Sequence, residues 1–141
     1  MIYRTYELDD YLEVAYKAEE YKSSFVNLST FLDLMVVGKY QGNIVTLVSK
    51  EQGKMNGCLV LSRAMDLSSG LLNLLFIWVD PHFPRLVYDL LKVADNVARE
   101  EGHKRIIIGT NRNPKAVARR IGKLGYHQTA VIFEKKVDSD D

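Results

Sequence analysis

The sequence predicts an α/β protein in which a single sheet carries helices on its faces. Two observations predict this class. Apolar, β-branched runs bounded by turn residues are typical of strands, and segments with apolar residues three or four positions apart are typical of helices. Both patterns recur along the chain, and the expected order is β-α-α-β-β-β-α-β-α-β.

The first half of the chain predicts a strand, two helices and a hairpin. The first helix begins at Asp9 or Asp10, because a carboxylate there accepts from the unpaired N–H groups of the first turn. Cys58, the single cysteine, lies in an apolar run and is interpreted as a small buried hydrophobe. The expected bounds are residues 2–7, 9–21, 29–38, 44–49 and 55–65, with a turn at 51–54.

The second half begins with a nearly unbroken apolar strand, which implies burial on both faces in the middle of the sheet. The strongest helix starts at Leu86 and ends at Gly102, the expected left-handed cap. A short strand, a turn, a last helix closed by Gly125 and a last strand complete the fold. A loop at 66–70 precedes the apolar strand at 71–79. The short strand is expected at 104–109, the turn at 111–114, the last helix at 115–124 and the last strand at 126–137.

Length and charge restrict the class of protein. The 141 residues contain 19 Lys and Arg against 18 Asp and Glu, a net charge of +1. This balance excludes a general nucleic-acid binder, which needs a large cationic excess. We expect one domain over residues 1–137 and an acidic, frayed tail over residues 138–141. Without a membrane-length apolar run or a signal pattern, the protein is expected in the cytoplasm, or in a particle assembled there.

Three motifs in the second half then indicate a family. V-D-P stands at 79–81 before the long helix, N-P-K-A at 113–116 before the last helix, and K-L-G-Y at 123–126 after it. In this order and spacing they resemble the GNAT family, the acyl-CoA-dependent N-acyltransferases. The resemblance covers about half of the chain by motif and the first half by element order. It implies a mixed, mostly antiparallel sheet flanked by helices.

The resemblance implies acyl-CoA as cofactor, and here the sequence departs from the family pattern. The family loop after V-D-P carries a Gln/Arg-x-x-Gly-x-Gly/Ala motif whose N–H groups point at the pyrophosphate. Glycines let the backbone approach a phosphate, and a helix N-terminus stabilises its charge. Residues 82–87 contain no glycine, form a shorter segment, and include Pro84, which has no N–H. The sequence predicts that this grip is deleted.

The family's catalytic groups are missing as well. Members often place a tyrosine in the last helix, and counting from Asn113 or back from Gly125 puts that position at Arg120 or Ile121. Others use a glutamate on the central strand, but residues 73–79 contain no carboxylate. Asp80 is the nearest acid and the one catalytic candidate, although an Asp before a Pro is typical of a strand-end turn.

If acyl-CoA binds, the resemblance implies which residues contact it. The strand that ends at Val79 would splay from the strand at 104–109, so the backbone of Ile77, Trp78 and Val79 would contact the pantetheine arm. Asn113 would border the site. The aromatic side chains of this strand, Trp78 among them, are equally interpretable as core and rim residues. We place the phosphates near two cations, Arg85 and Arg120.

A basic cluster without any acid surrounds the last helix. It is either an anion site or the solvated face of a helix that buries its other side. The first helix is correspondingly acidic, so charge pairing between two copies is one possible result. The three histidines, His82, His103 and His127, are too dispersed to predict a metal site. The cluster consists of Arg112, Lys115, Arg119, Arg120 and Lys123.

Two functions from different classes remain. The departures favour a degenerate GNAT-fold protein, non-catalytic or weakly active, that serves as a structural or interaction module with a protein partner or a second copy. Tailed phages carry small GNAT-like proteins of this kind, some in the virion. The alternative is an acyl-CoA-dependent N-acetyltransferase that acts on an amine, with acetyl-CoA as cofactor; direct transfer tolerates a missing base if water carries the proton.

Overall fold

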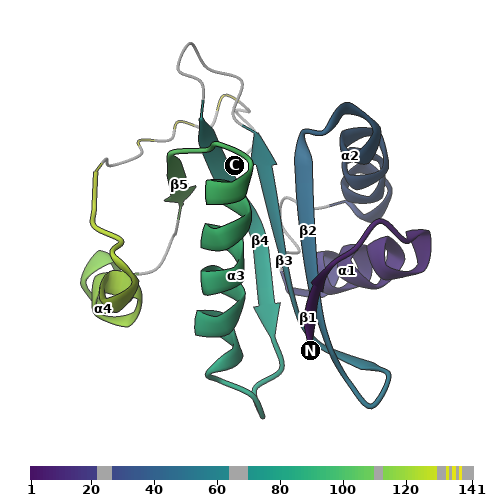
Figure 1. The fold of residues 1–141 in the computed structure, drawn as a ribbon, viewed down its shortest axis with the longest axis horizontal. Helices are drawn as coiled ribbons and strands as arrows, with labels where there is room; N and C mark the ends of the chain where they lie inside the picture. The colour runs from purple at the N-terminus through teal and green to yellow at the C-terminus, as the bar shows by residue number, and fades with distance from the viewer. Residues whose placement is uncertain are drawn as a thin grey trace. The chain divides into compact units, whose positions relative to one another are not determined.

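A five-stranded sheet in the order β1-β2-β3-β4-β5 forms the centre of the first part of the chain (Figure 1). This computed structural model describes residues 1–21, 27–63, 70–109, 113–129, 133, 135 and 137. It divides into two units, Met1–Gly109 and Thr110–Asp141. The strands are β1 (Ile2–Arg4), β2 (Ile44–Glu51), β3 (Lys54–Arg63), β4 (Leu71–Val79) and β5 (Arg105–Ile108). Only the β4–β5 pair is parallel, so the sheet is mixed and mostly antiparallel.

Three helices pack against this sheet (Figure 1). They are α1 (Leu8–Tyr21), α2 (Leu28–Gln41) and α3 (Leu86–Glu100). Cys58 of β3 belongs to the core beneath α1 and α2, whereas a Cβ built on its neighbour Gly57 would meet Leu86 of α3. Because consecutive strand residues point to opposite faces, α3 covers one face and α1 and α2 cover the other.

The core beneath α1 and α2 is built from the apolar faces of both helices. Val14, Ala15 and Ala18 of α1 are fully buried, and Phe31 and Met35 of α2 pack beside them. The Asn27 side chain caps α2 by accepting from the N–H groups of Ser29 and Thr30, at 2.9 and 3.3 Å. These contacts bury the apolar stripes of both helices against the sheet.

A buried ion pair fixes the start of α1 to β2. The carboxylate of Asp10 lies 2.8 Å from Lys50 Nζ and accepts from the Thr5 hydroxyl at 2.5 Å and the Tyr3 hydroxyl at 3.1 Å. Burial alone raises the pKa of Asp10, but the hydrogen bonds and the Lys50 charge outweigh it and lower that pKa below 3.8. Asp10 therefore joins β1, α1 and β2 through side-chain contacts. The prediction that it or Asp9 caps the helix is wrong, because α1 begins at Leu8 and both residues lie inside its first turn.

The second unit contains α4 (Pro114–Ile121), followed by a short 3-10 turn (Gly122–Leu124) and a left-handed Gly125 at φ 92°. The expected helix over 115–124 is thus confirmed. The expected strand over 126–137 is not found: residues 126–129, 133, 135 and 137 lie in no strand, and the other residues of that range are outside the described part. The apolar residues at its centre are among those undescribed positions.

The other expected elements are confirmed with small shifts at their ends. α2 starts at Leu28 and extends to Gln41, and β1 ends at Arg4 rather than at residue 7. Gly102 adopts the expected left-handed conformation, at φ 81°. The expected loop at 66–69, residues 64–65 of the hairpin, residues 111–112 of the turn and the tail at 138–141 lie outside the described residues. The single domain over 1–137 stays a prediction.

The strand at 71–79 lies inside the sheet as predicted, but its burial on both faces is confirmed only in part. Leu71, Leu72 and Phe76 are buried, but its other residues are half-buried. Asn73 and Leu74 are half-buried although they pair with β5, and Phe76 is buried beyond its end, so the burial of this strand depends on which helices cover its faces.

We predict that Gly38→Ala destabilises the protein. A Cβ at this position would lie 2.0 Å from Cγ1 of Ile44, so α2 or β2 would have to shift, at a cost of about 2–3 kcal/mol of unfolding free energy. Urea denaturation measures this loss. Gly122→Ala is the control, because nothing lies within 4 Å of its Cβ position. Equal stability of the Gly38 and Gly122 variants would contradict the packing of α2 on β2.

We also predict that Asp10→Asn lowers the unfolding free energy by roughly 2 kcal/mol at neutral pH, because it removes a buried charged partner. The pKa of Asp10 is lower in the folded chain, so its stabilisation is present above the ordinary value of 3.8 and is lost as pH falls through the folded-state pKa. Denaturation at pH 7 and pH 3 measures this, and the variant should lose less stability between them. Asp9→Asn, at an exposed neighbour, is the control; an equal effect would refute the role of Asp10.

Candidate functional site

The candidate site begins where β4 loses its parallel partner. β5 pairs with β4 from Leu71 opposite Arg105 to Leu74 opposite Ile108, and there β5 ends. β4 continues to Val79, and no described strand pairs with residues 76–79 on the β5 side. β4 therefore extends past the end of β5 (Figure 1), and the splaying of the two strands stays a prediction.

A β-bulge lies at the same point of β4. Val60 pairs with Phe76 and the next residue of β3, Leu61, pairs with Leu74, so Leu75 is the extra residue. A bulge redirects the side chains next to it, and Leu75 packs against the core beneath α1 and α2, as Phe76 does. Leu75 also lines a hollow of about 540 Å³ against α2, together with the apolar residues Phe31, Leu34 and Val37.

The half-buried residues Ile77, Trp78 and Val79 pair with β3 on their other side. The Trp78 ring stacks on Tyr21 of α1 at a centroid distance of 5.9 Å, and Lys17 Nζ lies 4.2 Å from its centroid. Its indole is therefore a packing partner of α1. Any contact of this strand end with a ligand in the β5 direction would use backbone atoms.

The connection from β4 to α3 is closed by its own hydrogen bonds. The N–H of Asp80 donates to the carbonyl of Asn56 at 2.8 Å, and the N–H of Phe83 donates to the carbonyl of Asp80 at 2.8 Å. The N–H of Leu86 then donates to the carbonyl of Phe83 at 3.0 Å. Pro81 and Pro84 have no N–H.

The first turn of α3 continues this pattern, since the N–H of Tyr88 donates to the carbonyl of Arg85 at 3.1 Å. Arg85 itself is exposed and offers no side-chain cap to the helix. The backbone donors that a phosphate needs are thus largely engaged within the chain, and the segment does not form the open cradle of a pyrophosphate loop.

The carboxylate of Asp80, the catalytic candidate, is hydrogen-bonded to His82. Its Oδ1 accepts from the His82 N–H at 2.9 Å and lies 2.8 Å from His82 Nδ1. The hydrogen bonds from the backbone and the ring of His82 lower the pKa of Asp80 below its ordinary value. A carboxylate with a lowered pKa is a weak base, so the contacts support the turn interpretation.

The surroundings of Cys58, His82 and His103 indicate neither a nucleophile nor a metal site in the described part of the chain. Cys58 is buried, as predicted, and burial raises the pKa of its thiol to about 12. His103 Nε2 lies 3.6 Å from Glu101 after the end of α3, whereas the His82 ring is exposed. No group of three or more His, Cys, Asp or Glu residues that could hold a metal occurs in the described part of the chain.

In the second unit, Asn113 serves as the cap of α4: its side chain accepts from the N–H of Lys115 at 2.9 Å. Arg120 is exposed. Because Arg85 belongs to the first unit, its proximity to Arg120 and Asn113 stays a prediction. The basic cluster is exposed at Lys115, Arg119, Arg120 and Lys123, while Arg112 lies outside the described residues.

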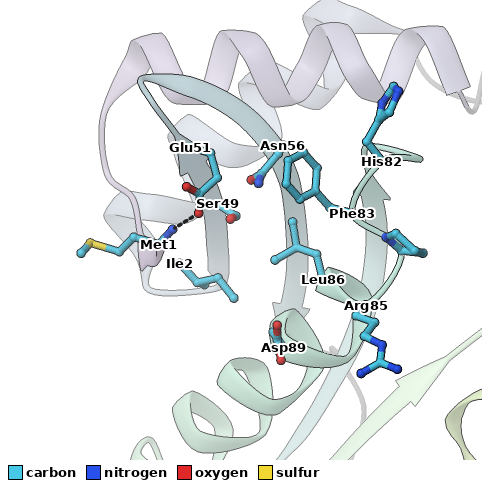
Figure 2. Close-up of a pocket in the computed structure, with 11 residues that line it drawn as sticks. Met1, Ile2, Ser49, Glu51, Asn56, His82, Phe83, Arg85, Leu86 and Asp89 are labelled. Carbon is cyan, nitrogen blue, oxygen red and sulfur yellow. Dashed lines mark hydrogen bonds and ion pairs between the residues drawn. The ribbon is translucent and has the colours of Figure 1, made fainter.

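A second hollow, of about 640 Å³, lies between the start of α3 and the end of the β2–β3 hairpin (Figure 2). Asn56 is the extra residue of a bulge in β3, because Ser49 pairs with Gly57 and Lys50 with Met55. Sequence reasoning missed both bulges and both hollows. The one signal for this hollow is a polar Asn inside the apolar run 55–61.

Comparison with solved structures identifies the class of fold as that of N-acetyltransferases. An aminoglycoside 6'-N-acetyltransferase, AAC(6')-Iy, solved with a CoA bisubstrate analogue, is 16% identical at a TM-score of 0.75, over 96% of this chain and 97% of that one. The AAC(6')-Ig enzyme from Acinetobacter haemolyticus is 18% identical at 0.70, over 98% and 99%.

A putative acetyltransferase of the GNAT family from Desulfovibrio desulfuricans is 20% identical at a TM-score of 0.75, over 94% of this chain and 87% of that one. The chain therefore has the GNAT fold, as its motifs predicted. No family model and no curated protein matches the sequence. No helix in the described ranges is long and apolar enough to cross a membrane.

We predict that His82→Ala raises the pKa of Asp80 toward 3.8, because it removes the ring contact that helps to lower it. Carboxyl carbon NMR titration of Asp80 measures the change. Lys92→Ala, an exposed change on α3, should leave that pKa unchanged. If the titration of Asp80 is the same with and without the His82 ring, the ring does not influence this carboxylate.

Proposed function

We propose that this GNAT-fold protein is a structural or interaction module, a pseudoenzyme with weak acyl transfer or none. The observation that carries the proposal is the closed connection between β4 and α3. Its N–H groups at Asp80, Phe83 and Leu86 donate to carbonyls of the chain itself, and two of its positions are proline. A pyrophosphate would find few free donors there.

The absence of suitable acid–base groups supports the same proposal. β4 carries no carboxylate, and the position at which family members often have a tyrosine holds Arg120 or Ile121. Asp80 is held in a turn by His82. Chemistry at this site would have to rely on backbone groups and water.

For the same reason we propose that the module acts through a protein partner or a second copy. The exposed basic face of α4 offers a docking site for an acidic surface, and α1 is acidic in its first turn. The balanced charge favours a protein over a nucleic acid as partner. We place the protein in the cytoplasm, or in the host cytoplasm or virion if a phage encodes it.

One observation favours the alternative of an acyl-CoA-dependent N-acetyltransferase acting on an amine. β4 extends past the end of β5, and the bulge at Leu75 and the adjoining hollow against α2 are present. A solved neighbour of the same fold is in complex with CoA. In this alternative, acetyl-CoA would lie along the backbone of Ile77, Trp78 and Val79, bordered by Asn113, with its phosphates near Arg85 and Arg120.

Titration with acetyl-CoA separates the two functions. A dissociation constant below about 100 μM would add about 1.4 kcal/mol of stability at 1 mM ligand and raise the melting temperature visibly. We expect no such shift, because the loop lacks free donors. A clear shift that Arg85→Ala and Arg120→Ala weaken, and Lys92→Ala does not, would reject the module in favour of the enzyme.

An interaction module must bind a partner, so association with another protein or with a second copy is a second test of the proposed function. Light scattering across concentrations and purification from the native source should show self-association or a defined copurifying protein. A strict monomer without any partner would count against the module even if acetyl-CoA does not bind.

A further inference from the structure

The exposed side of α2 is apolar, which distinguishes this helix from the other two on the sheet. Its 14 residues include two charged ones, whereas the exposed positions of α1 and α3 are mostly charged. Leu34, Val37 and Tyr40 are 43%, 52% and 81% exposed. A helix that is apolar all round is normally buried all round, so the exposed side of α2 has the character of an interface.

The exposed residues of α2 form one continuous surface, the α2 face. Lys39, the one cation of the helix, lies away from this face, and its Nζ donates to the carbonyl of Tyr6 at 2.6 Å. The single charge on the face is therefore the carboxylate of Asp33. Because an α-helix turns about 100° per residue, the face comprises the six exposed residues within about 60° of the direction of Val37: Thr30, Asp33, Leu34, Val37, Tyr40 and Gln41.

The two halves of the α2 face have complementary shapes. The first half borders the hollow of about 540 Å³, which Asp33 and Leu34 line together with Leu75 of β4. The second half contains Tyr40, whose ring lies 5.7 Å from Lys39 Nζ and is otherwise exposed to solvent. One helix thus carries both an open hollow and an aromatic side chain of the kind that fills one.

A two-fold axis beside Val37 brings these two halves together. When two α2 helices pack antiparallel about this axis, each residue meets the residue of the second copy at the same distance on the other side of Val37. Tyr40 lies about 4.5 Å after Val37 along the helix and Asp33 about 6 Å before it, on the same flank of the face. Tyr40 of each copy therefore reaches Asp33 and the hollow of the other.

The chemistry of this pair also matches. A phenol hydroxyl is a donor and an ionised carboxylate is an acceptor, and neither the Tyr40 hydroxyl nor Asp33 has a hydrogen-bond partner in the described ranges. The two-fold arrangement forms this charge-assisted hydrogen bond twice and places Val37 against Val37 on the axis. A surface that is complementary to itself favours a second copy over a different protein as its occupant.

We propose that the chain forms a two-fold dimer through the α2 face, with Tyr40 of each copy in the hollow of the other and its hydroxyl donating to Asp33. This inference rests on the proposed function and deepens it, because it makes a second copy the partner of the module. The contact uses no residue of α4 and needs no acyl-CoA.

Charge exchange on the axis tests the proposal by sedimentation velocity between about 10 μM and 1 mM protein. Wild type should dimerise, whereas Val37→Glu and Val37→Lys should each stay monomeric, because two like charges then meet on the axis. An equal mixture of the two variants should dimerise again, since a carboxylate then meets an ammonium. The control pair is Tyr16→Glu and Tyr16→Lys at an exposed position of α1, and each of these should dimerise as wild type does.

Tyr40 provides a second pair of variants. Tyr40→Phe removes only the hydroxyl and should raise the dimer dissociation constant at least about threefold. Tyr40→Ala also removes the ring from the hollow and should raise it at least about thirtyfold. Tyr16→Ala should leave it unchanged.

A wild-type monomer at about 1 mM, a dimer of Val37→Glu alone, a mixture that stays monomeric, or equal dimerisation of Tyr40→Ala and wild type would overturn the proposal. If the chain alone is monomeric and a different protein copurifies with it, the α2 contact fails while the module stands. Binding of acetyl-CoA, in contrast, would reject the module without changing the result of the mixing experiment.

Discussion

The short parallel pairing between β4 and β5 is the constraint on which the candidate site depends. It ends at Leu74 and Ile108, and the bulge at Leu75 follows at once. β4 continues beyond the end of β5, so its last residues are paired with β3 but with no other strand in the described part of the chain. The packing of Phe76 and Trp78 beneath α1 and α2 holds this strand in place while its other edge stays without a described strand partner.

β4 is followed by a connection to α3 whose N–H groups donate to carbonyls of the chain itself. Asp80 is tied backward to Asn56 and forward to Phe83, so the start of α3 is fixed to β3. A connection of this kind stabilises the chain without any ligand, whereas a pyrophosphate loop leaves its donors free. The GNAT fold is thus combined with a β4–α3 connection whose backbone donors are engaged within the chain. The bulge at Asn56 places a buried side-chain amide next to this connection.

The sequence predicted most of the architecture because strong local signals agree with it. Periodicity and caps located α1, α2, α3 and α4, and the missing glycines at 82–87 anticipated the closed connection. The bulges at Leu75 and Asn56 could not be predicted, because register depends on which residues of two strands face each other. The half-burial of β4 likewise depends on how far the helices cover its two faces, which its own apolar run does not encode.

Residue-resolved amide exchange measures whether the N–H groups between β4 and α3 are hydrogen-bonded within the chain. The amides of Phe83, Leu86 and Tyr88 should exchange slowly in the free protein, and their rates and chemical shifts should stay the same when acetyl-CoA is added. Fast exchange in the free protein, followed by protection or large shifts of these amides with acetyl-CoA, would contradict the account.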